Sequence, residues 1–339
     1  MTGTARLLKV ELSRLRARRA VLLLLAAAIV VPAIIAISTV LSTRPPSGAE
    51  LASVQAQVEA ETALPRTQRT LEKCLENPTR YGVDASGTDV QQACEDSVLP
   101  QPEWFYYYEP LDLDRERTFG SGTVVVAVLG VVMFLMGATF AGHDWATGSM
   151  SNQLLFQPRR ARVWAAKALA VTLASLVVAA VVTTAYWLCL GLVLQVRDDA
   201  APDGVLLEAL QQGWRGACFA AAGALGGYVL TMLSRSTVFS LGALFAVSVA
   251  GGILLGTIGP DDRGTLDPTI NAQAIITDGT EYYVSVPERC YNGSGEEAAG
   301  DDCDDRGERS LQQGVTYYGV LLAGVGAASL GSFRRRDVS

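Results

Sequence analysis

The chain has 339 residues, of which 50% are hydrophobic and only 18% are charged, whereas about 25% of residues are charged in ordinary soluble proteins. Its formal net charge is −7. Six stretches contain no Asp, Glu, Lys, Arg or His, and each approaches or exceeds the roughly 18–20 residues that cross a hydrocarbon core: 20–42, 121–142, 168–196, 216–234, 236–260 and 310–333. These features exclude an ordinary soluble protein and predict an all-α polytopic membrane protein.

The charge-free stretches divide the chain into membrane and aqueous segments. Six transmembrane helices are expected at 20–42, 121–142, 163–194, 213–234, 236–258 and 313–333. The remaining segments are an interfacial amphipathic helix (1–19), an outer segment with helices of its own (43–120), a cytosolic coupling segment (143–162), a short outer loop (195–212), an acidic outer loop (259–312) and a basic tail (334–339).

The distribution of charge predicts the orientation of these helices. With the N-terminus inside, the inner segments hold 14 of the 27 Lys and Arg residues, whereas 31 of the 34 Asp and Glu residues lie outside. Short loops rich in Lys and Arg stay in the cytosol during insertion. We therefore expect both termini in the cytosol and the protein in the plasma membrane.

The N-terminal residues 1–19 have the spacing of an amphipathic helix. Leu8, Leu12 and Leu15 share one face, so this helix could lie in the headgroup plane with its arginines against anionic lipid. A simple cluster of charges that directs insertion is the alternative. The apolar run after it is longer than that of a signal peptide and no A-x-A site follows, which favours an uncleaved first helix.

The two longer outer segments each contain a pair of cysteines. In segment 43–120, mixed charge at helical spacing on either side of Pro65 predicts one or two helices, and EYYVSV in the acidic loop suggests a strand. Because the outer side is oxidising, the preferred pairing is Cys74–Cys94 and Cys290–Cys303, although four cysteines allow three pairings and free thiols are the alternative.

Several kinds of chemistry have no signature in the sequence. There is no G-x-x-x-x-G-K-[ST] phosphate loop, and His143 is the single histidine, so no catalytic role or metal site is expected in this chain. Ion-coupled transporters usually carry ionisable groups inside the membrane, and none is expected within the spans. A stand-alone secondary transporter and an intramembrane enzyme are both disfavoured for these reasons.

Residues HDWATGSMSNQLLFQPRRARVWAAK connect the second and third spans. This stretch has an acidic residue, a Gly-Ser pair, a Leu-Leu pair, a proline, several arginines and a lysine that enters the next span: Asp144, Gly148, Ser149, Leu154, Leu155, Pro158, Arg159, Arg160, Arg162 and Lys167. We expect a short apolar helix over MSNQLLF, with the arginines and Lys167 at headgroup level. The positive charge of this segment would by itself indicate only that the segment is anchored on the cytosolic side of the membrane.

The order of these residues resembles the ABC-2-type transporter permeases. The basic N-terminal helix, the six spans and the tight LSRST turn between spans four and five are similar to that family as well. The resemblance implies an exporter subunit that pairs with a second permease chain, the same or different, and is driven by a separate ATPase docking on 143–162. ATP and Mg²⁺ would then bind to the ATPase and no cofactor to this chain. Membrane lipid is an expected partner and nucleic acid is not.

A second hypothesis belongs to a different class of protein. The chain could be a membrane-anchored sensor or assembly protein whose disulfide-linked outer segments bind a ligand. An ATPase would accompany the chain under the first hypothesis and not under the second. The transported substrate does not follow from the sequence.

Overall fold

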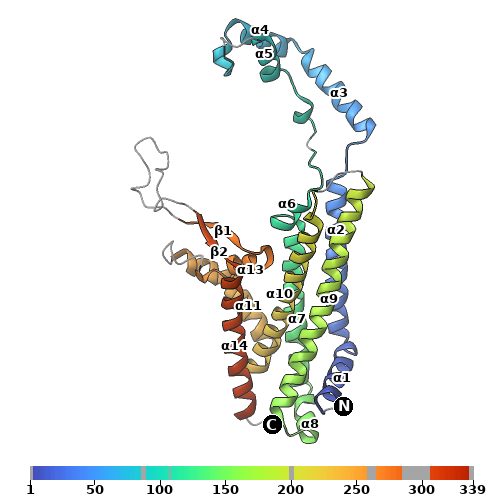
Figure 1. The fold of residues 1–339 in the computed structure, drawn as a ribbon, viewed down its shortest axis with the longest axis vertical. Helices are drawn as coiled ribbons and strands as arrows, with labels where there is room; N and C mark the ends of the chain where they lie inside the picture. Colours follow the sequence, from blue (N-terminus) through green and yellow to red (C-terminus); the bar gives the residue numbers. More distant parts are fainter. Residues whose placement is uncertain are drawn as a thin grey trace. The chain divides into compact units, whose positions relative to one another are not determined.

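The computed structural model describes residues 3–84, 89–106, 108–197, 202–257, 265–284 and 306–335, and side chains within them except those of 3–4 and 248–257. Most of these residues are helical (Figure 1). The chain forms two compact units. Unit 1 comprises Met1–Ser38 and Asp112–Ser339, and unit 2 comprises Thr39–Leu111. The Cys290 and Cys303 pairing lies outside the described residues.

Five helical segments are long and apolar enough to cross a membrane: Arg19–Ser42 (α2), Leu113–Ala146 (α6 Leu113–Thr118 and α7 Ser121–Ala146), Arg160–Val196 (α9), Val205–Ser234 (α10) and Leu311–Arg335 (α14). The sixth expected span, 236–258, coincides with helix α11, Thr237–Thr257. Its apolar part with described side chains, Thr237–Val247, is too short to count as a span by itself. The chain is therefore a helical, membrane-embedded multi-pass protein.

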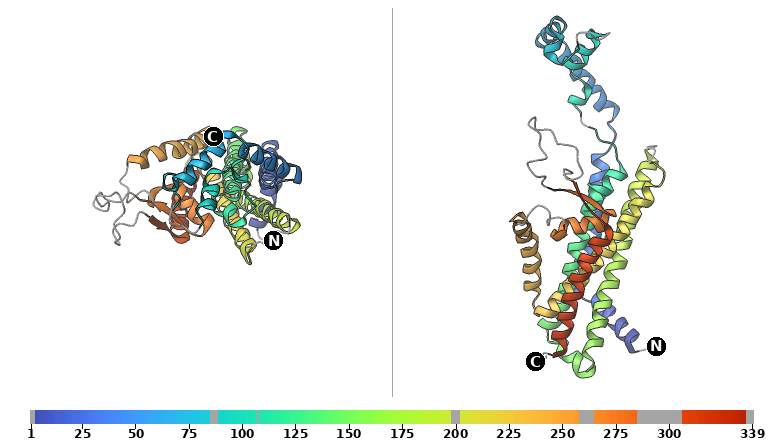
Figure 2. Two further views of the ribbon diagram at one scale, coloured as in Figure 1. Left: turned by 90° about the horizontal axis from the view of Figure 1, so that it is seen from above. Right: turned by 60° about the vertical axis from the view of Figure 1, so that its left-hand side comes forward.

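Helices α7, α9 and α10 form the core of unit 1 and run side by side in all views (Figures 1 and 2). Helices α7 and α10 approach each other closely at their glycines. A Cβ atom added to Gly227 would collide with the carbonyl oxygen of Phe134, and one added to Gly137 with that of Ala224. Only residues without a side chain allow backbones this close. Gly223, four residues before Gly227, also faces α7, at Gly130.

Helix α10 begins at Val205, eight residues before the expected start of the fourth span at 213. The expected outer loop 195–212 is thus mostly helical, and the fourth span continues a helix that begins before it. Glu208 pairs with Arg117 at 2.8 Å, and the buried Gln212 donates a hydrogen bond to the Arg117 carbonyl at 3.1 Å. The charge-free stretch begins only at residue 216, because Glu208 and Arg215 precede it.

The segment before α14 contains a helix and two short strands. Helix α13 spans Pro268–Thr277, with the Asp267 side chain accepting hydrogen bonds from the first backbone N–H groups. Strands β1 (Thr280–Tyr283) and β2 (Arg306–Arg309) are antiparallel, with Thr280 opposite Arg309. The expected strand at EYYVSV is therefore present in its first part, beginning one residue earlier.

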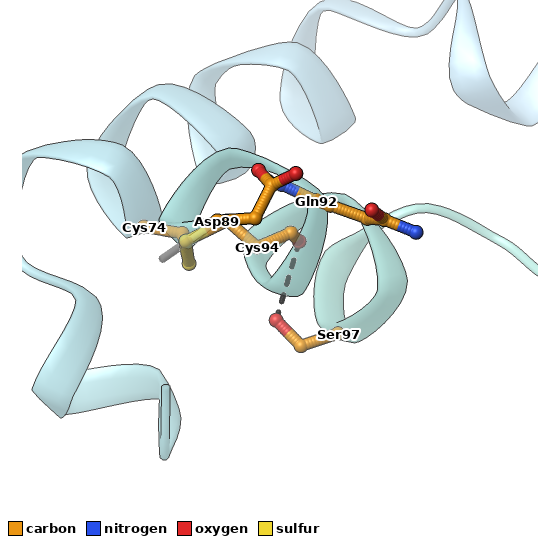
Figure 3. Close-up of a disulfide and its surroundings, with 5 residues drawn as sticks. All are labelled: Cys74, Asp89, Gln92, Cys94 and Ser97. Carbon is orange, nitrogen blue, oxygen red and sulfur yellow. Dashed lines mark hydrogen bonds between the residues drawn. A yellow bond between two sulfur atoms is a disulfide. The ribbon is translucent and has the colours of Figure 1, made fainter. Parts of the chain in front are cut away.

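Unit 2 consists of short helices held by a disulfide. They are α3 (Gly48–Thr62), α4 (Pro65–Glu76), the 3₁₀ turns Pro78–Tyr81 and Pro102–Trp104, and α5 (Val90–Val98). Pro65 starts α4, where its missing N–H costs nothing. Figure 3 shows Cys74 of α4 bonded to Cys94 of α5. The predicted Cys74–Cys94 pairing is confirmed.

The Cys74–Cys94 bond is the centre of a small core. Both cysteines are fully buried, with Val83 beside them and Leu71 and Tyr81 packed around. A unit this small buries little apolar surface, so a covalent link is an effective substitute for a larger core.

Candidate functional site

Lys167 lies in the second turn of α9, and its side chain is completely buried. Val163, Ala166 and Ala170 share its buried face, because residues three or four apart lie on one side of a helix. The Lys167 Nζ atom lies 2.6 Å from Asp144 Oδ2 of α7 and 2.8 Å from Glu11 Oε2 of α1 (Gly3–Arg16). Both carboxylates are also fully buried. One ammonium group therefore joins three helices.

Two arginines extend this group of charges. Arg18, between α1 and α2, pairs with Asp144 and lies over the Phe140 ring, 4.5 Å from its centroid. Arg14 lies 3.7 Å from Glu11. We call Glu11, Arg14, Arg18, Asp144 and Lys167 the ion cluster. Its three cations outnumber its two carboxylates, so one positive charge remains in excess.

The ion cluster can be stable in an apolar surrounding because its buried charges have oppositely charged partners. Removing a single partner from such a pair would leave an uncompensated charge, which costs far more than the pair itself contributes. The geometry therefore favours α1, α7 and α9 moving together. Separating these three helices at this position would cost free energy, because it would leave buried charges without partners.

The ion cluster places two of the predicted site residues inside the helix bundle. Lys167 and Asp144 are both fully buried between helices. The expected position of Lys167 at headgroup level stays a prediction. Lys167 lies inside the expected third span, 163–194, directly before the charge-free stretch 168–196. The partner that makes this burial possible, Glu11, comes from the other end of the sequence.

Sequence reasoning did not identify Glu11 and Arg18 as site residues. A signal for Glu11 was present, because it is the one acidic residue of α1 and lies beside Leu8, Leu12 and Leu15. Leu15 is 2% exposed and Glu11 is fully buried. A single carboxylate on the apolar side of a helix predicts a buried cationic partner. Arg18 had no comparable signal among its neighbouring arginines.

Helix α8, Ser149–Phe156, follows α7 and is attached to the ion cluster. It begins after Gly148, whose φ of +67° suits glycine. The Gln153 side chain donates to Glu11 Oε1 at 2.6 Å and accepts from Arg14 at 3.1 Å. Met150 is fully buried. The short helix expected over MSNQLLF is therefore present, and one side of it is fixed to the bundle.

The other side of α8 is exposed. Leu155 and Phe156 are 79% and 88% exposed, whereas Leu154 is half-buried. After Pro158, the arginines divide. Arg159 and Arg162 are exposed, while Arg160 starts α9 and donates to the Phe333 carbonyl of α14 at 3.3 Å.

The predicted site residues thus fall into two groups. Asp144 and Lys167 meet inside the bundle, and the residues between them form the surface of α8 and the loop after it. Arg160, Trp145 and Phe333 also bring the end of α14 to this place, with the Trp145 and Phe333 ring centroids 6.2 Å apart. We call this part of unit 1 the α8 end. It contains α1, α8 and the C-terminal end of α14 (Figure 1).

No family model matches the chain, and no curated protein or solved structure is significantly similar to it. Among the side chains that the structure describes, no three His, Cys, Asp or Glu residues are grouped as ligands for a metal ion.

Proposed function

We propose that the chain is the membrane-spanning subunit of an ATP-driven exporter of the ABC-2 type, in the plasma membrane and with both termini in the cytosol. A separate ATPase would dock on α8, and ATP and Mg²⁺ would bind to that ATPase. A second permease chain would complete the transport path. The observation that supports this proposal is the two-sided character of α8. Gln153 and Met150 fix it to the bundle, while Leu155 and Phe156 are exposed.

An exposed apolar pair beside arginines suits a groove on a soluble partner. Burying a leucine or phenylalanine side chain contributes about 1.5–3 kcal/mol each, so the two side chains could provide the anchor of a docking contact. Arg159 and Arg162 lie next to them and are exposed. They would hold the segment at the anionic inner surface of the membrane while the ATPase binds.

A movement of α8 would be transmitted to three helices at once. Lys167 links α9 to Asp144 of α7 and to Glu11 of α1, and Gln153 links α8 to the same carboxylate of Glu11. Closure of an ATPase dimer on ATP would therefore displace α1, α7 and α9 as a connected group, a rigid-body type of transition.

The test is affinity purification of the tagged chain from the native membrane in mild detergent, with bound proteins identified by mass spectrometry. We expect an ATP-binding cassette subunit with the natural chain and at least a tenfold smaller amount with L155D/F156D. Val10→Asp is the matched control, because Val10 is an exposed apolar residue of α1 at the same α8 end. It should retain the ATPase.

Absence of an ATPase from the natural chain would contradict the proposal. So would equal recovery of the ATPase with L155D/F156D. The sensor hypothesis predicts the first of these results, because such a protein needs no ATPase for binding a ligand with its outer segments.

A further inference from the structure

A cavity of about 560 Å³ lies at the α8 end, next to the ion cluster. It is formed by the corner between α1 and α2, by the last turns of α7 and by the start of α8. The polar residues that line it are Arg14, Arg18, Arg19, Thr139, His143 and Ser149. None of them is acidic, so the cavity wall carries positive charge and hydrogen-bond donors.

The three arginines of this cavity are not equally compensated. Arg18 pairs with the buried Asp144, and Arg14 lies near Glu11 and in the last turn of α1, where a cation is favourable. Arg19 is exposed and, among the described residues, its side chain has no hydrogen-bond or ionic partner. The His143 side chain likewise has no partner among them.

Arg19 also stands at an unfavourable position of its own helix. Helix α2 begins at Arg19, and the free N–H groups of a helix N-terminus carry a partial positive charge. The guanidinium of Arg19 and this helix end therefore add positive potential to the same side of the cavity. Adding an anion would reduce this repulsion, and no carboxylate lines the cavity to do so.

The donors suit a phosphate group in particular. A guanidinium presents parallel N–H groups that match two phosphate oxygens, and the hydroxyls of Thr139 and Ser149 can donate further bonds. Apolar surface begins directly after Arg19, because Leu22 and Leu23 of α2 are 49% and 72% exposed. A ligand with a phosphate at one end and a hydrocarbon chain at the other would match both features.

We propose that this cavity binds a phosphate group, with Arg19 as the principal contact and Arg14, His143, Thr139 and Ser149 around it. The headgroup of an anionic phospholipid and a small soluble phosphate share this chemistry. The site differs from the apolar α8 surface of Leu155 and Phe156 and does not depend on an ATPase.

The experiment uses the purified full chain in neutral detergent. Native mass spectrometry would measure binding of dioleoyl phosphatidylglycerol and of dioleoylglycerol, which has the same tails without phosphate. Calorimetric titration would measure binding of inorganic phosphate. We expect phosphatidylglycerol to bind at least tenfold more tightly than dioleoylglycerol. Arg19→Gln should weaken that binding about tenfold, because hydrogen bonds to charged groups are among the stronger ones.

Arg16→Gln is the matched control. It removes the same charge from an exposed residue three positions away that does not line the cavity, so it should change binding less than twofold. His143→Gln is a second variant in the cavity wall and should weaken binding in the same direction as Arg19→Gln. The thermal midpoints of all variants should remain close to that of the natural chain, because Arg16, Arg19 and His143 are exposed.

The possible outcomes distinguish a lipid headgroup from a soluble phosphate as the ligand, and both from results that would overturn the proposal. Arg19-dependent binding of phosphatidylglycerol identifies a lipid headgroup, and Arg19-dependent binding of inorganic phosphate alone identifies a soluble phosphate. Equal binding of dioleoylglycerol would overturn the proposal. Equal loss with Arg16→Gln and Arg19→Gln would do so too, since it would indicate a general attraction to positive charge, as would the absence of binding by every probe.

Discussion

Lys167 Nζ lies 2.6 Å from Asp144 Oδ2, and both side chains are fully buried. The two residues flank the segment that contains α8, so their ion pair closes a loop at its base. Asp144 is the last buried residue of α7, and Lys167 lies in the second turn of α9. This relationship gives a physical role to the acidic and basic residues at the two ends of the sequence motif, since together they fix where α8 leaves the bundle.

Lys167→Met should destabilise the protein strongly. It leaves Glu11 and Asp144 buried without their shared partner, and breaking a buried ion pair costs about 3–5 kcal/mol. The measurement is unfolding in mixed detergent micelles. Adding Asp144→Asn to Lys167→Met should recover part of this loss. The control, Arg306→Gln, removes a partner from the exposed pair with Glu281 and should change stability by less than about 1 kcal/mol. Equal effects of both single variants would contradict the role of the ion cluster.

Glu11→Gln should detach α1 from the bundle. Without the Glu11 carboxylate, α1 loses its ion pair with Lys167. Its hydrogen bond with Gln153 is also weakened, because the acceptor is no longer charged. Amide hydrogen exchange across α1 should then accelerate by about a hundredfold, whereas exchange in α10 should remain unchanged. Lys9→Gln changes charge on an exposed residue of the same helix and should leave exchange as it was. Unchanged protection in Glu11→Gln would show that the leucines alone hold α1.

Gly227→Ala should separate α7 from α10. The new methyl group would meet the backbone of Phe134 and Ala138, which cannot rotate away, and overpacking of this kind costs about 1–3 kcal/mol. Gly319→Ala in α14 is the matched control, because no atom lies within 4 Å of its added Cβ. That variant should be neutral or stabilising by up to about 1 kcal/mol. The thermal midpoints of the two variants should move in opposite directions or differ by several degrees.

Cys94→Ser should loosen unit 2 alone. The disulfide joins residues 20 positions apart, and a closed loop of that size contributes about 3 kcal/mol. Trypsin should then cleave within α4 much faster, as it should in the natural chain after reduction. Cys189→Ser and Cys218→Ser replace free, exposed cysteines of unit 1 and should leave the cleavage rate in α4 unchanged. Slow cleavage in Cys94→Ser would mean that the packing around Val83 is sufficient.

The first turn of α3 should lose protection at acidic pH. The Ser47 backbone N–H donates to Glu50 Oε2 at 2.7 Å, and this bond, with that from the Ser47 side chain and the nearby Arg44, lowers the pKa of Glu50 below its usual 4.5. A carboxylate whose pKa is lower in the folded state stabilises that state fully above its unfolded pKa. The contribution is lost as pH falls through the folded pKa.

Hydrogen exchange of the α3 amides between pH 5 and about pH 3 would measure this loss, after correction for intrinsic exchange rates. Glu50→Gln is the control, because glutamine retains the capping geometry without titrating. It should show little dependence on pH. A similar dependence in Glu50→Gln and in the natural chain would assign the effect to another carboxylate.

The sequence by itself determined that this is a helical membrane protein, because hydropathy and the residues that start or end a helix are local properties. Runs without charge predicted five helices that the structure also identifies as long and apolar enough to span a membrane. Pro65 lies between α3 and α4, where one or two helices were expected, Gly148 and Pro158 bracket α8, and the presence of Cys74 and Cys94 in one outer segment favoured their bond. Each of these features depends on neighbouring residues or on a short separation along the chain.

Only the tertiary structure decided where the charges of the α8 end lie. Lys167 and Glu11 are 156 positions apart and meet because α1 packs along α9. No local pattern distinguishes a lysine that anchors at a headgroup from one that is buried between two carboxylates, since the difference lies in the partner. The same is true of the early start of α10, where Gln212 is buried because it reaches the backbone of Arg117. Burial of a polar group depends on what the fold brings to it, and that information is not local in the sequence.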